Sequence, residues 1–311
     1  MAPKPRILAV GSTNIDFVAN VERVPSAGET LISSGSYSFV PGGKGANAAV
    51  AAARLGADVI FCARVGNDTY GKMLKNTYEN EGIDTRYVTF DKEQSTGLAA
   101  IYVESDGANR ITVFPGANHT LTEDMVEEAF TCYPDALLIQ FEIPKDIVYS
   151  SVKQANADGV PVFIDAGPII PDLDLSALGK IEIFSPNESE AFALTGIRPT
   201  DAESYIRICL DLYSRLDVKY IVLKLGDRGC YIYDGHLGEA VPSYNVCAVD
   251  TTAAGDAFTA ALTFEYLRSG SVRSACRYAN AVGALTVSKK GAFPSLPTEK
   301  QVLDFIKNNQ N

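Results

Sequence analysis

The chain is poor in the residues that bind metals or cross-link secreted proteins. Only two of its 311 residues are histidine, and its six cysteines are scattered without a Cys-x-x-Cys pair. Zinc sites and redox motifs need clustered cysteine and histidine, so we expect the cysteines to be core residues in a reducing compartment. His119 and His236 belong to no metal or triad motif, and we expect them on the surface or in loops.

Basic residues and long apolar runs are also scarce. The 27 Lys and Arg residues are outnumbered by 38 Asp and Glu, which gives a net charge of −11. A nucleic-acid-binding protein needs a basic face, so we expect no nucleic acid as partner. No apolar run reaches the roughly 20 residues of a membrane helix, and residues 1–6 lack the apolar stretch of a signal peptide. These features predict a cytoplasmic protein with no membrane partner.

Short apolar runs alternate with helical patterns along most of the chain. The strand-like runs are residues 7–10, 59–65, 136–140, 160–164, 181–184 and 220–225. Helical patterns occupy residues 46–55, 145–157, 187–195, 201–215, 254–268, 271–288 and 297–308. Strands that are apolar throughout and separated by helices are typical of a sheet buried on both faces. The sequence therefore predicts one α/β domain over residues 1–311, with a doubly wound, mostly parallel sheet and helices on both faces.

Two stretches break this alternation. Residues 16–40 contain two short apolar segments around Pro25 and Gly28, and residues 97–114 contain two more around Asp106-Gly107. Each stretch is typical of a pair of antiparallel strands joined by turn residues. We expect these pairs to form a small separate sheet, a lid inserted into the α/β domain.

The strongest local motif is DTTAAGD at residues 250–256, between a strand-like segment (244–249) and an apolar helix. The amides of Ala253, Ala254 and Gly255 would lie at a helix N-terminus, where anionic oxygens are favoured. Asp256 would then be placed to accept a proton from a hydroxyl. Aspartate is also common as a plain charge in a first helical turn, so the residues alone leave both interpretations open.

A second glycine cluster, PGGKGAN at residues 41–47, precedes an alanine-rich helix. It is not a phosphate-binding loop of the Walker type, because Ser38 replaces the first glycine and Gly45 follows the lysine. By itself the cluster is also compatible with a tight strand-to-helix turn.

Together, GGKGAN and DTTAAGD resemble the two signatures of the ribokinase (pfkB-type carbohydrate kinase) family. Further segments resemble that family in the expected order: residues 11–16, 95–97, 140–142, 186–190, 225–229 and 289–295. The resemblance covers essentially the whole chain. It implies a doubly wound fold with a β lid and transfer of a phosphoryl group from ATP to a sugar's primary hydroxyl. Asp256 would be the base, and the amides of residues 253–255 would hold the transferred group.

The resemblance also implies a sugar site. Its residues would be Asn14, Asp16, Gly43, Lys44, Asn47, Glu142 and Asp256. Strand alternation places Asn14 and Asp16 on one face, where Asp16 accepts from hydroxyls and Asn14 both donates and accepts. For Glu142 a sugar contact and a plain strand-end carboxylate are equally open. Lys44 has the alternative of an exposed loop lysine.

For the nucleotide, the resemblance implies contacts from Asn187, Lys224, Gly226, Asp227, Gly229, Gly255 and Asn280. Glu190 would position Mg²⁺ through water. Three alternatives stand beside these roles: a helix cap by Asn187, a hairpin turn at residues 226–229, and a solvent-facing Asn280.

A monovalent cation, K⁺, is implied beside the amides of residues 253–255. Its oxygen ligands would come from Asp250, Thr252, Thr286, Lys289, Gly291 and Ser295, several through the main chain. Oxygen ligands suit a hard cation. The alternative is that Asp250 only stabilises its own loop.

Two positions depart from the family pattern. Asp165 stands where ribokinases commonly carry asparagine, at a strand end on the ligand side, and Ala257 replaces the usual threonine after the base. The resemblance implies ribose as acceptor, and these departures leave another pentose, a ketohexose or a nucleoside as the alternative. A non-catalytic sugar-binding relative is a third hypothesis, which the presence of Asp256, Asn187 and Glu190 disfavours. An apolar lid face would be incomplete alone, so we expect a lid-to-lid homodimer.

Overall fold

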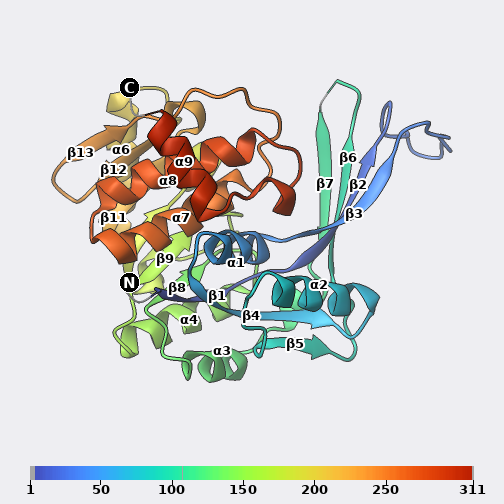
Figure 1. Ribbon diagram of the computed structural model, residues 1–311, viewed down its shortest axis with the longest axis horizontal. Coiled ribbons are helices and arrows are strands. Elements are labelled where there is room, and N and C mark those ends of the chain that lie inside the picture. The colour runs from blue at the N-terminus through green and yellow to red at the C-terminus, as the bar shows by residue number, and fades with distance from the viewer. Residues whose placement is uncertain (1–3, 107, 310–311) are drawn as a thin grey trace.

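The computed structural model describes residues 4–106 and 108–309, and these residues form two β-sheets of different size (Figure 1). The larger sheet has the strand order β13-β12-β11-β10-β9-β8-β1-β4-β5. Its strands are β1 (Arg6–Val10), β4 (Asp58–Gly66), β5 (Val88–Asp91), β8 (Ala136–Ile139), β9 (Val162–Asp165), β10 (Lys180–Ser185), β11 (Asp217–Lys224), β12 (Cys230–Tyr233) and β13 (Gly238–Val241). All pairs from β11 to β5 are parallel, whereas β12 and β13 pair antiparallel at one edge.

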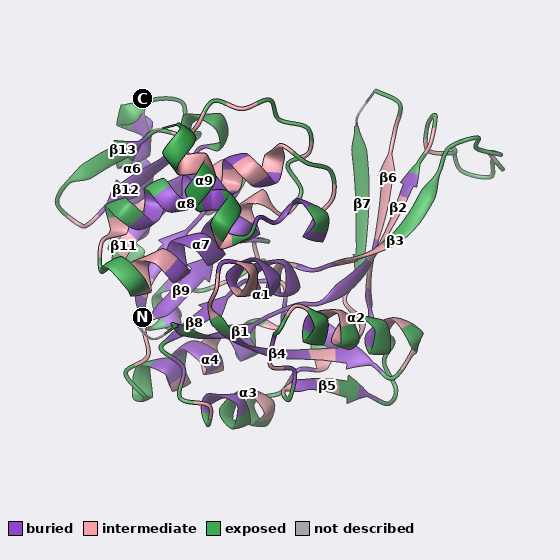
Figure 2. Ribbon diagram, in the orientation of Figure 1, coloured by how far each residue is buried: buried purple, intermediate pink, exposed green. Residues whose placement is uncertain are grey.

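Helices cover both faces of this sheet, as the alternating pattern predicts. One apolar core lies under α1 (Lys44–Arg54), α2 (Thr69–Asn80), α7 (Ala254–Ser269), α8 (Val272–Val287) and α9 (Glu299–Asn308). The other lies under α3 (Glu123–Phe130), α4 (Lys145–Ala157), α5 (Glu188–Thr195) and α6 (Ala202–Arg215). The central strands β1, β8 and β9 are buried almost throughout (Figure 2). The doubly wound fold is therefore confirmed, and among the described helices none is long and apolar enough to cross a membrane.

The smaller sheet projects from the main body (Figure 1). It has the order β3-β2-β6-β7, with β2 (Asn14–Asn20), β3 (Tyr37–Gly42), β6 (Gly97–Val103) and β7 (Asn109–Phe114). The two predicted antiparallel pairs, β2 with β3 and β6 with β7, are both present, and β2 and β6 join them in parallel. Gly107, part of the predicted turn, lies outside the described residues. Strand β7 is exposed along its whole length.

The sequence did not predict every helix and strand. Helices α2 and α3 and the short strands β5, β12 and β13 were not predicted, since short or polar segments carry a weak periodic signal. The strand predicted over residues 244–249 is wrong. That segment follows β13 as a loop and lines a cavity, so its apolar side chains face space between elements rather than a neighbouring strand.

Candidate active site

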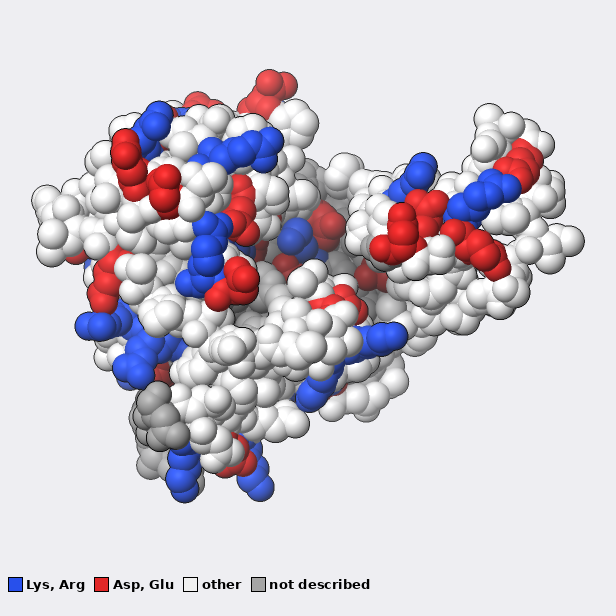
Figure 3. Space-filling view, turned by 90° about the horizontal axis from the view of Figure 1, so that it is seen from above, with Lys and Arg blue, Asp and Glu red and all other residues white. Residues whose placement is uncertain are grey.

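The surface of the molecule is hollowed between the main body and the projecting sheet, and acidic and basic side chains lie together in this hollow (Figure 3). Asp256, in the first turn of α7, is 4 % exposed. Its carboxylate accepts a hydrogen bond from Asn47 Nδ2 at 2.7 Å and forms an ion pair with Lys44 Nζ at 3.3 Å. The Asp256 carboxylate is the main reason that the pKa of Lys44 lies above its ordinary value. The two motifs GGKGAN and DTTAAGD, about 210 residues apart in sequence, therefore meet at this carboxylate.

The glycines of the first motif let α1 approach the end of β1. Gly43 has a φ of 93°, and a Cβ there would lie 2.8 Å from Thr13 Cα. A Cβ on Gly45 would lie 2.6 Å from the Gly11 carbonyl carbon. Only glycine fits both conditions. The motif thus places the amino end of α1, with Lys44 and Asn47, beside the strand that carries Asn14.

The predicted sugar residues gather around this point. Asn14 begins β2 and Asp16 follows it on the same strand face. Burial, helped by the nearby carboxylates of Glu142 and Asp256, raises the pKa of Asp16 to about 7. Glu142 accepts hydrogen bonds from Ser12 Oγ and from the Lys44 main-chain amide. Glu142 therefore has a structural role: its carboxylate links the segment after β1 to the start of α1.

The amino end of α7 has the geometry of an anion site. Ala253 is its N-cap residue with a left-handed φ of 61°. The Ala254 amide donates to the Thr251 carbonyl at 3.2 Å, whereas Gly255 occupies the second helical position, where an amide has no intrahelical partner. A Cβ on Gly255 would lie 3.6 Å from Lys224 Nζ. An ammonium group therefore adds its charge to the helix terminus.

Asp165, the departure from the family pattern, is the counterion of this lysine. Its Oδ2 lies 2.6 Å from Lys224 Nζ and 2.7 Å from Thr259 Oγ1, and Asp165 is 1 % exposed. Burial works to raise the pKa of Asp165, but the ammonium groups of Lys224 and Lys44 outweigh it and hold that pKa below its ordinary value. Asp165 thus acts inside the protein: its Oδ2 binds Lys224 and Thr259, and its Oδ1 accepts from the Gly167 amide at 3.2 Å.

A cavity of about 910 Å³ opens on the other side of the α7 terminus. The predicted nucleotide residues line it: Asn187, Lys224, Gly226, Asp227, Gly229, Gly255 and Asn280. Sequence analysis missed several apolar members of its wall, namely Tyr244, Val246, Phe258, Ala284 and Val287. A signal for part of this wall was present, because residues 280, 283, 284 and 287 follow one face of a helix.

The structure also resolves the alternatives at three of these positions. Asn187 caps α5 through its side chain, and Glu190 Oε2 completes the capping box by accepting from the Asn187 amide at 2.7 Å. The turn at residues 226–229 does join β11 to β12 as a hairpin. The solvent-facing alternative for Asn280 is wrong: this residue is 4 % exposed and donates to the Val241 carbonyl. Burial raises the pKa of Glu190.

The predicted cation region consists of two adjoining loops. Asp250 Oδ1 accepts from the Thr252 amide at 2.9 Å, and its Oδ2 accepts from the Gly291 amide at 2.8 Å. Asp250 therefore does stabilise its loop and joins it to residues 289–295. Thr286 and Ser295 are fully buried, whereas Lys289 is exposed. Within residues 4–106 and 108–309, no group of three or more His, Cys, Asp or Glu side chains is arranged to hold a metal ion.

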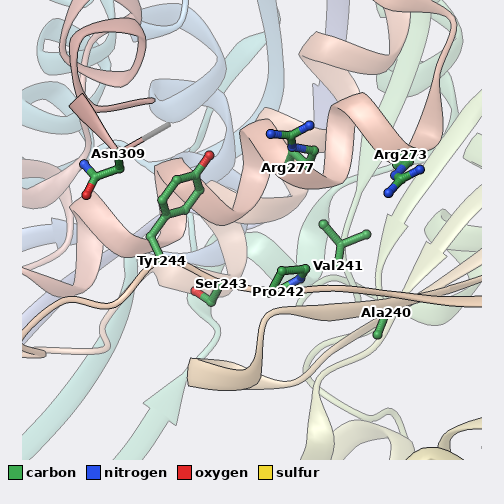
Figure 4. Close-up of a pocket in the computed structure, with 8 residues that line it drawn as sticks. All are labelled: Ala240, Val241, Pro242, Ser243, Tyr244, Arg273, Arg277 and Asn309. Atoms are coloured by element: carbon green, nitrogen blue, oxygen red, sulfur yellow. The ribbon is translucent and has the colours of Figure 1, made fainter. Parts of the chain in front are cut away.

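A second, smaller cavity of about 370 Å³ adjoins the nucleotide-sized cavity. Ser243 and Tyr244 line both cavities. Arg273 and Arg277 of α8 face this space, and Asn309 borders its other end (Figure 4). Arg273 forms an ion pair with Glu239 of β13 at 3.0 Å.

A buried carboxylate at the amino end of a helix, between the polar residues of β2 and a nucleotide-sized cavity, is typical of enzymes that phosphorylate small molecules. Residues 4–299 match the profile of the pfkB family carbohydrate kinases. The chain belongs to that family, as the resemblance of GGKGAN and DTTAAGD predicted.

Curated relatives support this assignment over nearly the full length. A ribokinase from Haemophilus influenzae is 36 % identical over 304 residues, which cover 96 % of this chain and 98 % of the relative. A deoxyribokinase from Salmonella typhi is 32 % identical over 98 % of this chain and 99 % of its own. The structure of Arabidopsis thaliana ribokinase complexed with ribose and ATP is 33 % identical, with a TM-score of 0.89 over 99 % of both chains.

Proposed function

We propose that this enzyme transfers the γ-phosphoryl group of ATP to the primary hydroxyl of ribose, giving ribose 5-phosphate and ADP. The observation that carries the proposal is the position of Asp256, which is held by Lys44 and Asn47 at the amino end of α7. That position lies between the polar residues of β2 and the nucleotide-sized cavity. Relatives named ribokinase, and one solved with ribose and ATP, support the choice of acceptor.

In the proposed reaction Asp256 accepts the proton of the sugar's primary hydroxyl while the hydroxyl oxygen bonds to the γ-phosphorus. The bond from that phosphorus to the bridging oxygen breaks, and the electron pair leaves with ADP. Phosphoryl transfer depends mainly on positioning and charge stabilisation. The Gly255 amide, the α7 terminus and the Lys224 ammonium supply that stabilisation. Asn14, Asp16, Gly43, Lys44, Asn47 and Glu142 form the proposed sugar site.

The residues present fit the cations that the family implies. Glu190 is a buried carboxylate bonded to the amide of Asn187, which lines the nucleotide cavity, and we place Mg²⁺, held through water and the ATP phosphates, near it. A bound Mg²⁺ supplies charge neutralisation for the transferred group. The proposed K⁺ site uses oxygens of the two loops that Asp250 joins, residues 250–252 and 289–295, together with Thr286 at the end of α8.

We further propose that the α/β body and the small sheet act as one catalytic domain, with residues 16–40 and 97–114 as its lid, and that the chain works in the cytoplasm. The lid exposes Tyr37, Ile111 and Phe114 by 71 %, 55 % and 56 %. Exposed apolar side chains at this density favour contact with a second copy of the chain. This contact would make a homodimer.

The proposed function is tested by measuring ADP release with ribose, 2-deoxyribose, arabinose, fructose and nucleosides. Ribose should give the highest kcat/KM, and a preference for 2-deoxyribose or another acceptor would overturn the ribose assignment. Asp256→Asn should reduce kcat by at least ~10³-fold while calorimetry still detects sugar binding. Near-normal turnover in Asp256→Asn would refute the role of Asp256 as base.

A further inference from the structure

Asn118 lies beside the proposed sugar site, although no sequence motif drew attention to it. It belongs to η1 (Gly116–Thr120), the short 3-10 helix that follows β7, and it is 2 % exposed. We propose that Asn118 is a positioning residue that fixes the orientation of the Asn14 amide, so that Asn14 presents hydrogen-bond donors to the sugar. This inference rests on the proposed function only in taking the ligand of Asn14 to be a sugar.

The orientation of the Asn118 side chain follows from the main chain of Thr13. The Thr13 amide, which can only donate, lies 2.9 Å from one side-chain atom of Asn118, and this atom must be Oδ1. The Thr13 carbonyl, which can only accept, lies 3.1 Å from the other, which must be Nδ2. Two main-chain groups of one residue therefore assign both ends of the Asn118 amide.

The same argument extends to Asn14. The second hydrogen of Asn118 Nδ2 points to a side-chain atom of Asn14 at 2.8 Å. That atom must accept, so it is Oδ1. The Asn14 Nδ2 group then faces away from Asn118, and it donates no hydrogen bond to the protein atoms that the structure describes. Asn14 is left with two donors for a ligand.

Close packing keeps this pair in place. Gly97, at the start of β6, pairs with Asn14 across the sheet. A Cβ on Gly97 would lie 2.3 Å from both Asn118 Nδ2 and Asn14 Oδ1. Any larger residue would therefore separate the two amides, and the contact exists because this position is glycine.

The helix η1 is fastened to the large sheet. Thr120 Oγ1 donates to Asp91 Oδ2 at 2.7 Å, and Arg64 Nη1 donates to the Thr120 carbonyl at 2.5 Å. Arg64 and Asp91, on β4 and β5, are ion-paired at 3.0 Å. Asn118 is thus held by the main body, while β2 and β6 continue from this point into the lid.

This arrangement gives the sugar site a fixed pattern of hydrogen-bond donors and acceptors. Ionised Asp16 only accepts hydrogen bonds, and an Asn14 fixed by Asn118 only donates them toward the ligand. A hydroxyl both donates and accepts, so the two side chains can hold sugar hydroxyls through both functions. If the Asn14 amide turned round, it would present an oxygen acceptor and this complementarity would be lost.

The experiment combines Asn118→Ala and Asn118→Asp with Asn14→Ala. In Asn118→Ala, we expect the Kd of the sugar to rise roughly tenfold while the KM of ATP changes by less than about twofold. Asn118→Asp keeps an acceptor for the Thr13 amide but offers no donor to Asn14, so the Asn14 amide should turn and sugar affinity should fall at least as far. In the Asn14→Ala background neither change should alter the sugar Kd by more than about twofold.

Two controls separate positioning from general loosening. Thr120→Val weakens the attachment of η1 without touching Asn14, and His119→Ala alters an exposed neighbour. Both should keep the wild-type sugar Kd. If Thr120→Val weakens sugar binding as much as Asn118→Ala at equal loss of stability, Asn118 is merely structural and the inference is overturned. The inference also fails if Asn118→Ala still raises the sugar Kd roughly tenfold in the Asn14→Ala background.

A measurement without sugar keeps this inference distinct from the proposed function. Urea unfolding of the wild type, both single variants and the Asn118→Ala/Asn14→Ala double variant gives the coupling between the two positions. We expect roughly fivefold coupling in the unfolding equilibrium constant. No coupling refutes the contact, even if sugars bind. A wild type that binds and phosphorylates no sugar, but shows the coupling, would instead overturn the proposed function.

Discussion

Removing one partner of the ion pair between Asp165 and Lys224 should lower the free energy of unfolding more than removing both partners. Their side chains are only 2 % and 9 % exposed. Replacing one member of such a buried pair leaves an uncompensated charge, which typically costs about 3–5 kcal/mol. Asp165→Asn keeps an oxygen for Thr259 and Lys224, so we expect a loss of free energy of unfolding near the lower limit, about 3 kcal/mol.

The double variant Asp165→Asn/Lys224→Met removes both charges together. Replacing a buried pair by uncharged groups of similar volume is often nearly neutral, so the double variant should recover to within about 1 kcal/mol of the wild type. Asp211→Asn, which breaks an exposed pair with Arg215, is the control and should cost at most about 0.5 kcal/mol.

Equilibrium urea unfolding measures the stability of these variants, and steady-state kinetics with varied ATP measures the other consequence. Because Lys224 lines the nucleotide cavity, the recovered double variant should still bind ATP poorly, with a KM raised roughly tenfold or more. A loss below about 1 kcal/mol in Asp165→Asn, or a double variant less stable than both singles, would refute the reasoning about the buried pair.

Three further predictions concern pH, the cation and the lid. The folded protein holds the Asp16 proton up to pH about 7, against 3.8 for a free carboxyl, so the stability from this proton is present below about pH 4 and is lost as pH rises through 7. Ionised Asp16 accepts hydrogen bonds from sugar hydroxyls, so sugar affinity should increase as pH rises from 5 to 8. An Asp16→Asn variant whose sugar affinity keeps this pH dependence in calorimetry would exclude Asp16 as its source. Replacing K⁺ by tetramethylammonium should lower kcat several-fold, and Asp250→Ala should abolish the difference; equal rates in both salts would exclude the cation site. Ile111→Glu with Phe114→Glu on the lid should convert a dimer to monomer in sedimentation, and an unchanged sedimentation coefficient would exclude this lid face as the interface.

The sequence predicted the fold where the pattern was strong. Strands such as β1 and β8 are apolar at nearly every position, and residues of this kind only fit a sheet buried on both faces. The turn residues around Pro25 and Gly28 indicated a separate antiparallel pair, which the small sheet contains. Residues 244–249 were misassigned because an apolar run looks alike whether it faces a sheet or a cavity.

The candidate site was likewise predicted only in part. The resemblance carried by GGKGAN and DTTAAGD placed Lys44, Asn47 and Asp256 in one site, and the structure brings these three side chains together. Asp165 could only be noted as a departure, since its partner Lys224 is 59 residues away. Which oxygen or nitrogen an amide presents depends on neighbours that the chain brings together only when folded.

The amino-acid sequence by itself thus determined the layers of the fold, because they depend on local pattern, and it indicated the family through the resemblance of GGKGAN, DTTAAGD and the segments between them. Tertiary structure alone decided that Asp165 neutralises Lys224, that Glu142 ties β1 to α1 and that Asn118 orients Asn14. These roles arise from contacts between segments distant in sequence, inside a space where an unpaired charge or amide is costly. Such contacts exist only once packing has fixed the distances between the segments.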